Sequence, residues 1–303
     1  MTLRIGIVGA GTMGAVHAEA WAHTPAQVVG FVSRRLDNAR RLAIQHGASA
    51  FETLDAMLPH VDVVDICTPP SLHLEQTLAA ARAGKHVVCE KPIARTIEQA
   101  EQMISACRAA GVKLLVAHVV RYFDAYASAY ARLVNGHLGA VRLLSLSRLG
   151  RMPSGWFADW DASGGVLLDL MIHDYDFARW VAGEVTRVRA CLAPLAVEGA
   201  PAQHAVVTLT HTSGAVSYVE GSWANPGPFR TSFRIVAERG LVEYDTALAQ
   251  RDGKNPYATQ AQAFYDALAN DAPLRVTAED GLAALRIALA AIASACAGQD
   301  VSL

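Results

Sequence analysis

Apolar and polar positions follow two different rhythms along the chain, and the change comes near residue 121. In the first part, short runs rich in Val and Ile lack polar alternation, which predicts strands buried on both faces of a parallel sheet. The predicted strands span residues 3–8, 27–33, 61–68, 86–90 and 113–119. Helical patterns separate them, over residues 15–23, 36–46, 72–83 and 97–110. This alternation predicts a doubly wound α/β domain with right-handed crossovers.

Beyond residue 121 the run 141–149 alternates apolar and polar residues, as a half-exposed antiparallel strand does. Further strand-like runs cover residues 185–197, 204–211, 216–223, 231–237 and 241–244. Helical patterns cover residues 125–133, 166–181, 257–269 and 277–297. Thr277 and Asp280, three residues apart, resemble a capping box at the start of the last helix. The second part is therefore expected to be α+β, on a largely antiparallel sheet.

A glycine-rich turn lies between the first predicted strand and the first predicted helix, with glycines at positions 9, 11 and 14. Gly9 can take a turn that residues with a Cβ avoid, and Gly11 lets the backbone approach a phosphate. Gly14 lets the helix pack close to the strand, and N–H groups at the helix start face the anion. The pattern predicts a dinucleotide site formed by Gly9, Gly11, Thr12, Met13 and Gly14. A purely structural glycine turn is the alternative.

Composition and charge narrow the class of protein. The 303 residues suffice for two domains, and 26 basic against 28 acidic residues give a formal charge of -2. This balance offers no electrostatic case for nucleic acid or for an anionic membrane. No uninterrupted apolar run approaches the length of a membrane span, and the first strand leaves no room for a signal peptide. Five scattered cysteines without a C-x-x-C pair favour reduced thiols in the cytoplasm over a zinc site or disulfides.

The end of the second predicted strand bears on the choice of coenzyme. An NAD site usually has an acidic residue there, which holds the ribose diol. This chain has Ser33, Arg34 and Arg35 instead. Ser33 can bond a 2′-phosphate, and an arginine can pair with it or stack on adenine. We therefore predict NADP as the preferred coenzyme, with NAD possible. The alternative is that both arginines are a solvated helix start with Asp37 as the cap.

Three further segments carry a family resemblance: T-P-P-S-L-H at 68–73, A-G-K-H-V-V-C-E-K-P at 83–92 and G-G-V-L-L-D-L-M-I-H-D-Y-D at 164–176. With the N-terminal glycines, they resemble the Gfo/Idh/MocA family of NAD(P)-dependent oxidoreductases, named for glucose-fructose oxidoreductase and inositol dehydrogenase. The resemblance covers essentially the whole chain. It implies an NAD(P)-binding Rossmann domain over residues 1–120 and a substrate-binding and oligomerisation domain over 121–303.

The resemblance also implies an activity. Hydride would pass between a nicotinamide coenzyme and a ring secondary alcohol or ketone of a sugar or inositol-like polyol. The expected partners are this small polyhydroxylated substrate and further copies of the chain, as a homodimer or homotetramer. Two residues depart from the family pattern: Pro70 stands where Asn is frequent, and Asp124 where Pro is common. Neither residue belongs to the proposed chemistry.

Lys91 follows the C-terminal end of a buried parallel strand, where ligands of open α/β sheets bind. Its ammonium can polarise a carbonyl or stabilise an alkoxide, so Lys91 is a candidate for both catalysis and substrate binding. The alternative is a surface lysine that pairs with Glu90. Coenzyme contacts are also expected at the ends of the predicted strands 61–68 and 86–90. The residues concerned are Thr68, Pro69, His73, Glu90 and Lys91.

Asp169 and His173 are four residues apart in a helical pattern, so they are expected to share one face, which Asp176 continues. Buried polar groups need partners, and a carboxylate beside an imidazole would raise the pKa of the histidine and orient its ring. His173 could then take a hydroxyl proton as hydride leaves the same carbon. The alternatives are a helix-capping Asp169 with a packed His173, or a metal held with Asp176. We predict no metal, because a third strong ligand is not evident.

Four other residues have two interpretations each. His73 is expected to be structural or a peripheral coenzyme contact rather than catalytic. Arg121 could bind a substrate hydroxyl or form an interdomain ion pair. Trp156 could stack on the apolar face of a sugar or simply pack a loop, as could Trp160. His17 is expected to be a packing residue.

Other functions remain open on the residues alone: a reductase of a non-sugar carbonyl, a coenzyme-retaining glycosidase and a non-catalytic coenzyme-sensing regulator. A regulator would not need Lys91, Asp169 and His173 together, so the complete set argues against it. A glycosidase would retain its coenzyme through gel filtration and would produce no net reduced coenzyme.

Overall fold

The computed structural model describes residues 2–197, 200–248 and 253–303. The chain forms two compact units. The first consists of Met1–Tyr122 and Lys254–Leu282, and the second of Phe123–Gly253 and Ala283–Leu303. The segment 254–282 thus belongs to the first unit, whereas the division predicted from the sequence placed it in the second domain.

The first unit is built on a six-stranded sheet in which every pairing is parallel, in the order β3-β2-β1-β4-β5-β6. Its strands are β1 (Arg4–Val8), β2 (Gln27–Val32), β3 (Ser49–Phe51), β4 (Val63–Ile66), β5 (His86–Glu90) and β6 (Leu114–Ala117). The strand order reverses between β1 and β4, so the two neighbouring crossovers leave the sheet on opposite faces. Ligands of doubly wound sheets bind at such a point.

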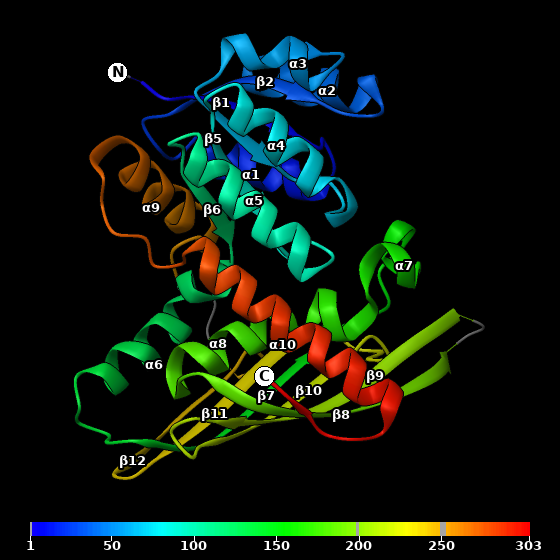
Figure 1. The fold of residues 1–303 in the computed structure, drawn as a ribbon, viewed down its shortest axis with the longest axis vertical. Helices are drawn as coiled ribbons and strands as arrows, with labels where there is room; N and C mark the ends of the chain where they lie inside the picture. The colour runs from blue at the N-terminus through cyan, green and yellow to red at the C-terminus, as the bar shows by residue number, and fades with distance from the viewer. Residues whose placement is uncertain (1, 198–199, 249–252) are drawn as a thin grey trace. The chain divides into compact units, whose positions relative to one another are not determined.

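Helices and short turns connect these strands. They are α1 (Thr12–Trp21), α2 (Leu36–His46), α3 (Leu54–Met57), η1 (Leu58–His60), η2 (Pro70–Leu72), α4 (His73–Arg82), α5 (Ile97–Ala109) and η3 (Val119–Tyr122). Helix α9 (Pro256–Asn270) comes from much later in the chain and completes the unit (Figure 1). Its buried Phe264 joins the core cluster of β1 and α1, which includes Ile7 and Trp21.

The second unit contains a seven-stranded sheet in the order β12-β11-β7-β10-β9-β8-β13, with β7 and β10 as its one parallel pair among the described residues. The strands are β7 (Val141–Leu149), β8 (Val185–Val197), β9 (Ala200–His211), β10 (Val216–Ser222), β11 (Arg230–Ala237), β12 (Gly240–Asp245) and β13 (Val301–Ser302). The predicted fold class, a Rossmann domain followed by an α+β domain with a largely antiparallel sheet, is confirmed.

The helical elements of this unit are α6 (Asp124–Val134), η4 (Gly155–Ala158), α7 (Trp160–Ser163), η5 (Val166–Leu170), α8 (Ile172–Ala182) and most of α10 (Ala278–Ala297). Figure 1 shows α6, α8 and α10 on the same side of the sheet. The capping box at the start of α10 is confirmed. The N–H of Thr277 donates to Asp280 Oδ2 at 2.9 Å, and the N–H of Asp280 donates to Thr277 Oγ1 at 3.1 Å.

Helix α10 is also the one described helix that is long and apolar enough to cross a membrane by length and composition. This is weak evidence for a span, because a buried helix of a protein core has the same composition. Half of its most apolar stretch is buried inside the protein, and Leu285 and Ala288 are fully inaccessible.

Candidate active site

The glycine turn after β1 has the shape that a dinucleotide cradle requires. Gly9 has φ +105°, and a Cβ there would lie 2.6 Å from the Cys67 backbone. A Cβ at Gly14 would lie 1.9 Å from the carbonyl oxygen of Gly9, whereas a Cβ at Gly11 would meet nothing within 4 Å. Gly9 and Gly14 are therefore needed for the fold of the turn, and Gly11 leaves its outer side open to a ligand.

The start of α1 suits an anion. The helix begins at Thr12 with Gly11 as N-cap, no side chain caps it, and its first turn holds no acidic residue. The first N–H groups of a helix have no partner within the helix and carry partial positive charge. The residues here, with Thr12 and Met13 in the first turn, fit the pyrophosphate of a dinucleotide.

The end of β2 lies beside this turn, because the Gly9 N–H donates to the Val32 carbonyl at 2.8 Å. Ser33 follows and is half-buried, and Arg34 and Arg35 are exposed. Neither arginine has an ion-pair partner among the residues that the structure describes. Asp37 does not cap α2 but lies in its first turn, with its carboxylate 3.4 Å from Arg40.

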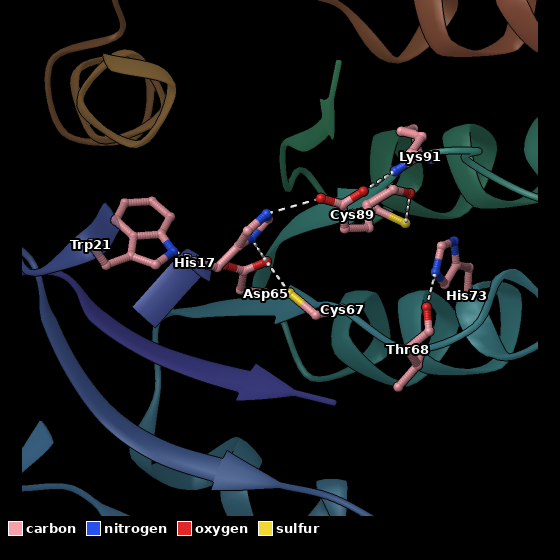
Figure 2. Close-up of polar contacts among 9 residues, drawn as sticks. His17, Trp21, Asp65, Cys67, Thr68, His73, Cys89 and Lys91 are labelled. Carbon is pink, nitrogen blue, oxygen red and sulfur yellow. Dashed lines mark hydrogen bonds and ion pairs between the residues drawn. The ribbon is translucent and has the colours of Figure 1, made fainter. Parts of the chain in front are cut away.

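The T-P-P turn after β4 is tied to the K-P turn after β5 by the buried side chain of His73. Its Nε2 lies 2.9 Å from the Thr68 carbonyl oxygen (Figure 2). Its Nδ1 lies 3.1 Å from the Pro92 carbonyl oxygen. Burial lowers the pKa of His73. Both ring nitrogens face backbone carbonyls, which favours the structural interpretation of His73, with Thr68 and Pro69 held in place by it.

Lys91 leaves the end of β5 next to a buried carboxylate. Glu90 is 7% exposed, and its Oε2 accepts the backbone N–H of Lys91 at 2.9 Å. Its Oε1 lies 3.0 Å from His17 Nε2. Burial, the largest effect, would alone raise the pKa of Glu90, but the hydrogen bonds and the charges of His17 and Lys91 together hold the pKa below its ordinary value. The sequence left open that Lys91 and Glu90 form an ion pair on the surface. Glu90 does not fit that alternative, because its carboxylate is buried and contacts His17.

The expectation that His17 only packs is also wrong. Its Nδ1 lies 3.0 Å from both carboxylate oxygens of Asp65, and Asp65 also accepts Trp21 Nε1–H at 2.7 Å (Figure 2). A single Asp inside the apolar strand Val63–Ile66 was the signal that could have revealed this cluster.

Among the described residues, His17, Asp65 and Cys67 are the one group close enough to hold a metal ion. Both ring nitrogens of His17 already face carboxylates, as two N–H donors would. An imidazole that donates from both nitrogens has no lone pair for a metal. The geometry therefore describes a hydrogen-bonded cluster.

In the second unit, Asp169 lies in a π-helical turn, η5. The Met171 N–H donates to the Val166 carbonyl, five residues back, at 3.0 Å, and α8 begins one residue later. The predicted single helix over 166–181 is therefore wrong at its start. The wide turn seats Met171 against the sheet at Gly221, where a Cβ would lie 2.3 Å from Met171 Cγ. Single π turns occur frequently at functional sites.

His173 and Asp176 follow on α8, His173 half-buried and Asp176 fully buried. Asp174 is also buried, but it pairs with Arg148 of β7 through two hydrogen bonds of 2.7 and 2.9 Å. Burial alone would lower the pKa of Arg148, and the Asp174 carboxylate outweighs it and raises the pKa. Asp174 therefore joins α8 to the sheet.

A cavity of about 600 Å³ opens beside η5 in the second unit. Asp169 is part of its wall, and aromatic side chains from two loops, Phe157, Trp223 and Phe229, supply much of the rest. Trp156 is absent from the lining and stacks on Phe157 with ring centroids 3.9 Å apart. Phe157, next to the predicted Trp156, lines this cavity, and so do Trp223 and Phe229, which the sequence did not single out. Trp160 packs over Gly165.

Arg121 is 2% exposed and belongs to the first unit. Its Nη1 donates to the Arg275 carbonyl at 2.9 Å and lies 3.3 Å from Asp280 Oδ2. Both of these partners, Arg275 and Asp280, belong to the same unit as Arg121. These contacts favour the structural interpretation of Arg121 over substrate binding.

Comparison with known proteins agrees with this geometry. A family model described as the oxidoreductase family with an NAD-binding Rossmann fold matches residues 3–118. The model of the GFO/IDH/MocA C-terminal domain matches residues 126–243. The chain therefore belongs to the Gfo/Idh/MocA family of oxidoreductases, and its first unit is an NAD-binding Rossmann domain.

Named relatives cover nearly the whole chain. The 1,5-anhydro-D-fructose reductase of Ensifer adhaerens is 30% identical, over 99% of this chain and 98% of that protein. The inositol 2-dehydrogenase of Rhizobium meliloti is 28% identical, over 100% of both. Among solved structures, a putative myo-inositol dehydrogenase from Sinorhizobium meliloti superposes with a TM-score of 0.90 at 26% identity, over 99% of both chains.

Proposed function

We propose that the protein reversibly oxidises a ring secondary alcohol of a sugar or inositol-like polyol. The observation that carries this proposal is the cavity of the second unit, which Asp169 lines together with the aromatic residues Phe157, Trp223 and Phe229. Sugar and inositol rings present hydroxyl groups at their edges and apolar C–H groups on their faces, so they suit a wall of this mixed character. The relatives named above act on an anhydro sugar and on an inositol, which supports the same substrate class.

Three side chains would perform the chemistry. Asp169 would orient the imidazole of His173, which would take the hydroxyl proton as the C–H bond breaks. The Lys91 ammonium would stabilise the negative charge that develops on the same oxygen. The nicotinamide ring of the coenzyme, when bound, accepts the hydride and returns it in the reverse direction. Gly9, Gly11 and the start of α1 would hold the pyrophosphate.

A coenzyme-reduction screen over inositols, aldoses, anhydro sugars and simple aliphatic alcohols tests this proposal. We expect turnover with at least one polyol and low activity on the aliphatic alcohols. Exclusive activity on a flat aromatic or short apolar carbonyl would replace the proposal with the non-sugar reductase. Coenzyme that survives gel filtration, together with no net reduction, would instead point to the glycosidase.

We further propose that the enzyme prefers NADP to NAD. Arg34 and Arg35 extend from the end of β2 beside the glycine turn without an ion-pair partner among the described residues, and Ser33 adds a hydroxyl. A 2′-phosphate would accept charge-assisted hydrogen bonds from these groups, and each such bond is worth about 1.5–3 kcal/mol.

We expect kcat/KM to be higher with NADP. The double variant Arg34→Ala/Arg35→Ala should lower kcat/KM for NADP by about tenfold or more and leave that for NAD nearly unchanged. Arg41→Ala removes another exposed arginine of α2 and is the matched control. A wild-type preference for NAD of tenfold or more would contradict the proposal. The expected oligomeric state and the expected cytoplasmic location stay predictions.

A further inference from the structure

The buried cluster around His17 links three parts of the Rossmann domain. His17 lies on α1, the helix that starts at the coenzyme cradle, and is 4% exposed. Asp65 lies on β4, and Glu90 is the last residue of β5. Each ring nitrogen of His17 faces one of these carboxylates at 3.0 Å (Figure 2).

The contacts define the charge of the ring. A neutral imidazole has one N–H, whereas a ring between two ionised carboxylates needs two donors. Burial, the largest effect, would alone lower the pKa of His17, but the neighbouring Asp65 and Cys67 together raise it well above its ordinary value. His17 is therefore an imidazolium at neutral pH, and it compensates the buried charge of Glu90.

The remaining neighbours of the ring carry no charge. Cys67 follows β4, and burial raises the pKa of its thiol to about 12, so it is protonated. Helix α9 contributes Tyr257 and Gln260 to the small space beside His17. Trp21 donates its indole N–H to Asp65. The two carboxylates, the imidazolium and the Lys91 ammonium, which also lowers the pKa of Glu90, are thus the charged groups that decide the state of the cluster.

The second carboxylate oxygen of Glu90 accepts a hydrogen bond just beyond the last residue of β5 that pairs with β6. Residue 90 is the last of β5 to pair with β6. The next N–H, that of Lys91, donates to Glu90 Oε2 at 2.9 Å. The carboxylate thereby fixes the main chain where Lys91 leaves the sheet, and His17 holds the other oxygen of the same carboxylate.

We propose that His17 is a positioning residue for Lys91. Its imidazolium holds the Glu90 carboxylate in the orientation that fixes the backbone at Lys91, and so sets the direction in which the ammonium group extends. This inference rests on the proposed catalytic role of Lys91. It assigns to the first helix a task in catalysis in addition to coenzyme binding.

Two amide substitutions separate the two contacts of the ring. The amide nitrogen of an asparagine can occupy the place of Nδ1, and that of a glutamine the place of Nε2. His17→Asn can therefore keep the contact with Asp65 and loses Glu90, while His17→Gln can keep Glu90 and loses Asp65. Both remove the charge. We expect His17→Asn to lower kcat by about 10²-fold, the cost of a misplaced catalytic group, and His17→Gln to retain most of the activity.

Two further measurements separate positioning from stability. Asp65→Asn weakens the cluster away from Glu90, so it should lower the unfolding midpoint clearly but reduce kcat less than His17→Asn does. In a Lys91→Ala background, His17→Asn should have little additional effect on kcat, whereas a merely structural residue would lower kcat by the same factor in both backgrounds. Coenzyme affinity, measured by fluorescence titration, should be unchanged in His17→Asn.

The outcomes distinguish the two hypotheses. Normal turnover in Lys91→Ala would overturn the proposed catalytic role of Lys91, and the positioning role of His17 with it. A strong loss in Lys91→Ala with normal turnover in His17→Asn would overturn the positioning role alone, as would equal losses in His17→Asn and His17→Gln. If His17→Asn does not fold, Glu90→Asp makes the same test, because it keeps the charge but is too short to reach both partners.

The charge state has its own test in the wild-type protein. Nitrogen NMR of labelled histidine should show both ring nitrogens of His17 protonated through neutral pH, whereas an ordinary histidine loses its second proton near about pH 6.5. Because the folded-state pKa is raised, the contribution of His17 to stability is complete below the unfolded value and is lost as pH rises through the folded value. A ring at pH 7 without a proton on Nε2 would contradict the hydrogen bond that His17 donates to Glu90, and with it the positioning role.

Discussion

Replacing Lys91 or His173 by alanine is expected to lower kcat by about 10²- to 10⁴-fold, the usual contribution of a group that moves a proton or stabilises charge at the reacting atom. Lys91 lies directly after β5, at the same carboxyl edge of the sheet as the glycine turn that follows β1. His173 lies at the start of α8, just after the π turn that carries Asp169. Steady-state kinetics with an active polyol and saturating coenzyme measures both effects.

The chain offers matched controls for both substitutions. Lys85 precedes β5 by one residue, as Lys91 follows it by one, so Lys85→Ala removes a lysine from the opposite end of the same strand. His204 is a half-buried histidine of β9, 4.0 Å from Glu220. Both control variants should keep normal kcat. Near-normal turnover in His173→Ala would remove it as the base and leave that role to Lys91.

Asp169→Asn tests how the pair works. If Asp169 acts through His173, the double variant with His173→Ala should be far less damaged than the product of the two single effects. Coenzyme affinity should survive in both variants, because the cradle lies in the other unit. Independent, multiplicative losses would show instead that Asp169 has a separate role.

The sequence predicted the elements whose signal is local. The parallel strands, the glycine turn and the capping box of Thr277 and Asp280 each depend on residues that are neighbours in the chain. Strand β3 and helix α3 escaped prediction because three or four residues carry too little periodicity. The amphipathic pattern of α9 indicated a buried face, but periodicity does not tell which unit that face covers.

The candidate site was harder to predict where contacts join distant residues. His17 is 48 residues from Asp65 and 73 from Glu90, and no spacing rule relates them. The π turn at Asp169 depends on the space that Gly221 leaves for Met171, and Gly221 lies on β10, which follows α8, β8 and β9 in the chain. The loop aromatics Trp223 and Phe229 lie outside any periodic segment, so nothing in their own neighbourhood marked them as cavity residues.

Asp174→Ala is expected to destabilise the protein by about 3–5 kcal/mol, because it leaves the buried guanidinium of Arg148 without its partner. The side chains of Arg148 and Asp174 are 6% and 1% exposed, and two hydrogen bonds join them. Urea denaturation followed by circular dichroism measures the loss. Glu184→Ala is the control, because it breaks the pair with Arg179, in which Glu184 is 62% exposed, and exposed pairs contribute about 0–1 kcal/mol.

The double variant Arg148→Met/Asp174→Leu distinguishes charge from shape at this position. Two buried charges gain attraction but lose hydration, so a pair of apolar side chains of similar volume can be as stable as the ion pair. We expect the double variant to recover most of the stability that Asp174→Ala loses, and to keep kcat near normal because Asp174 faces the sheet. If the double variant were as unstable as Asp174→Ala, the geometry of the hydrogen bonds, rather than the uncompensated charge, would be what holds α8 on β7. A loss of kcat in a stably folded double variant would place Asp174 among the residues that orient His173.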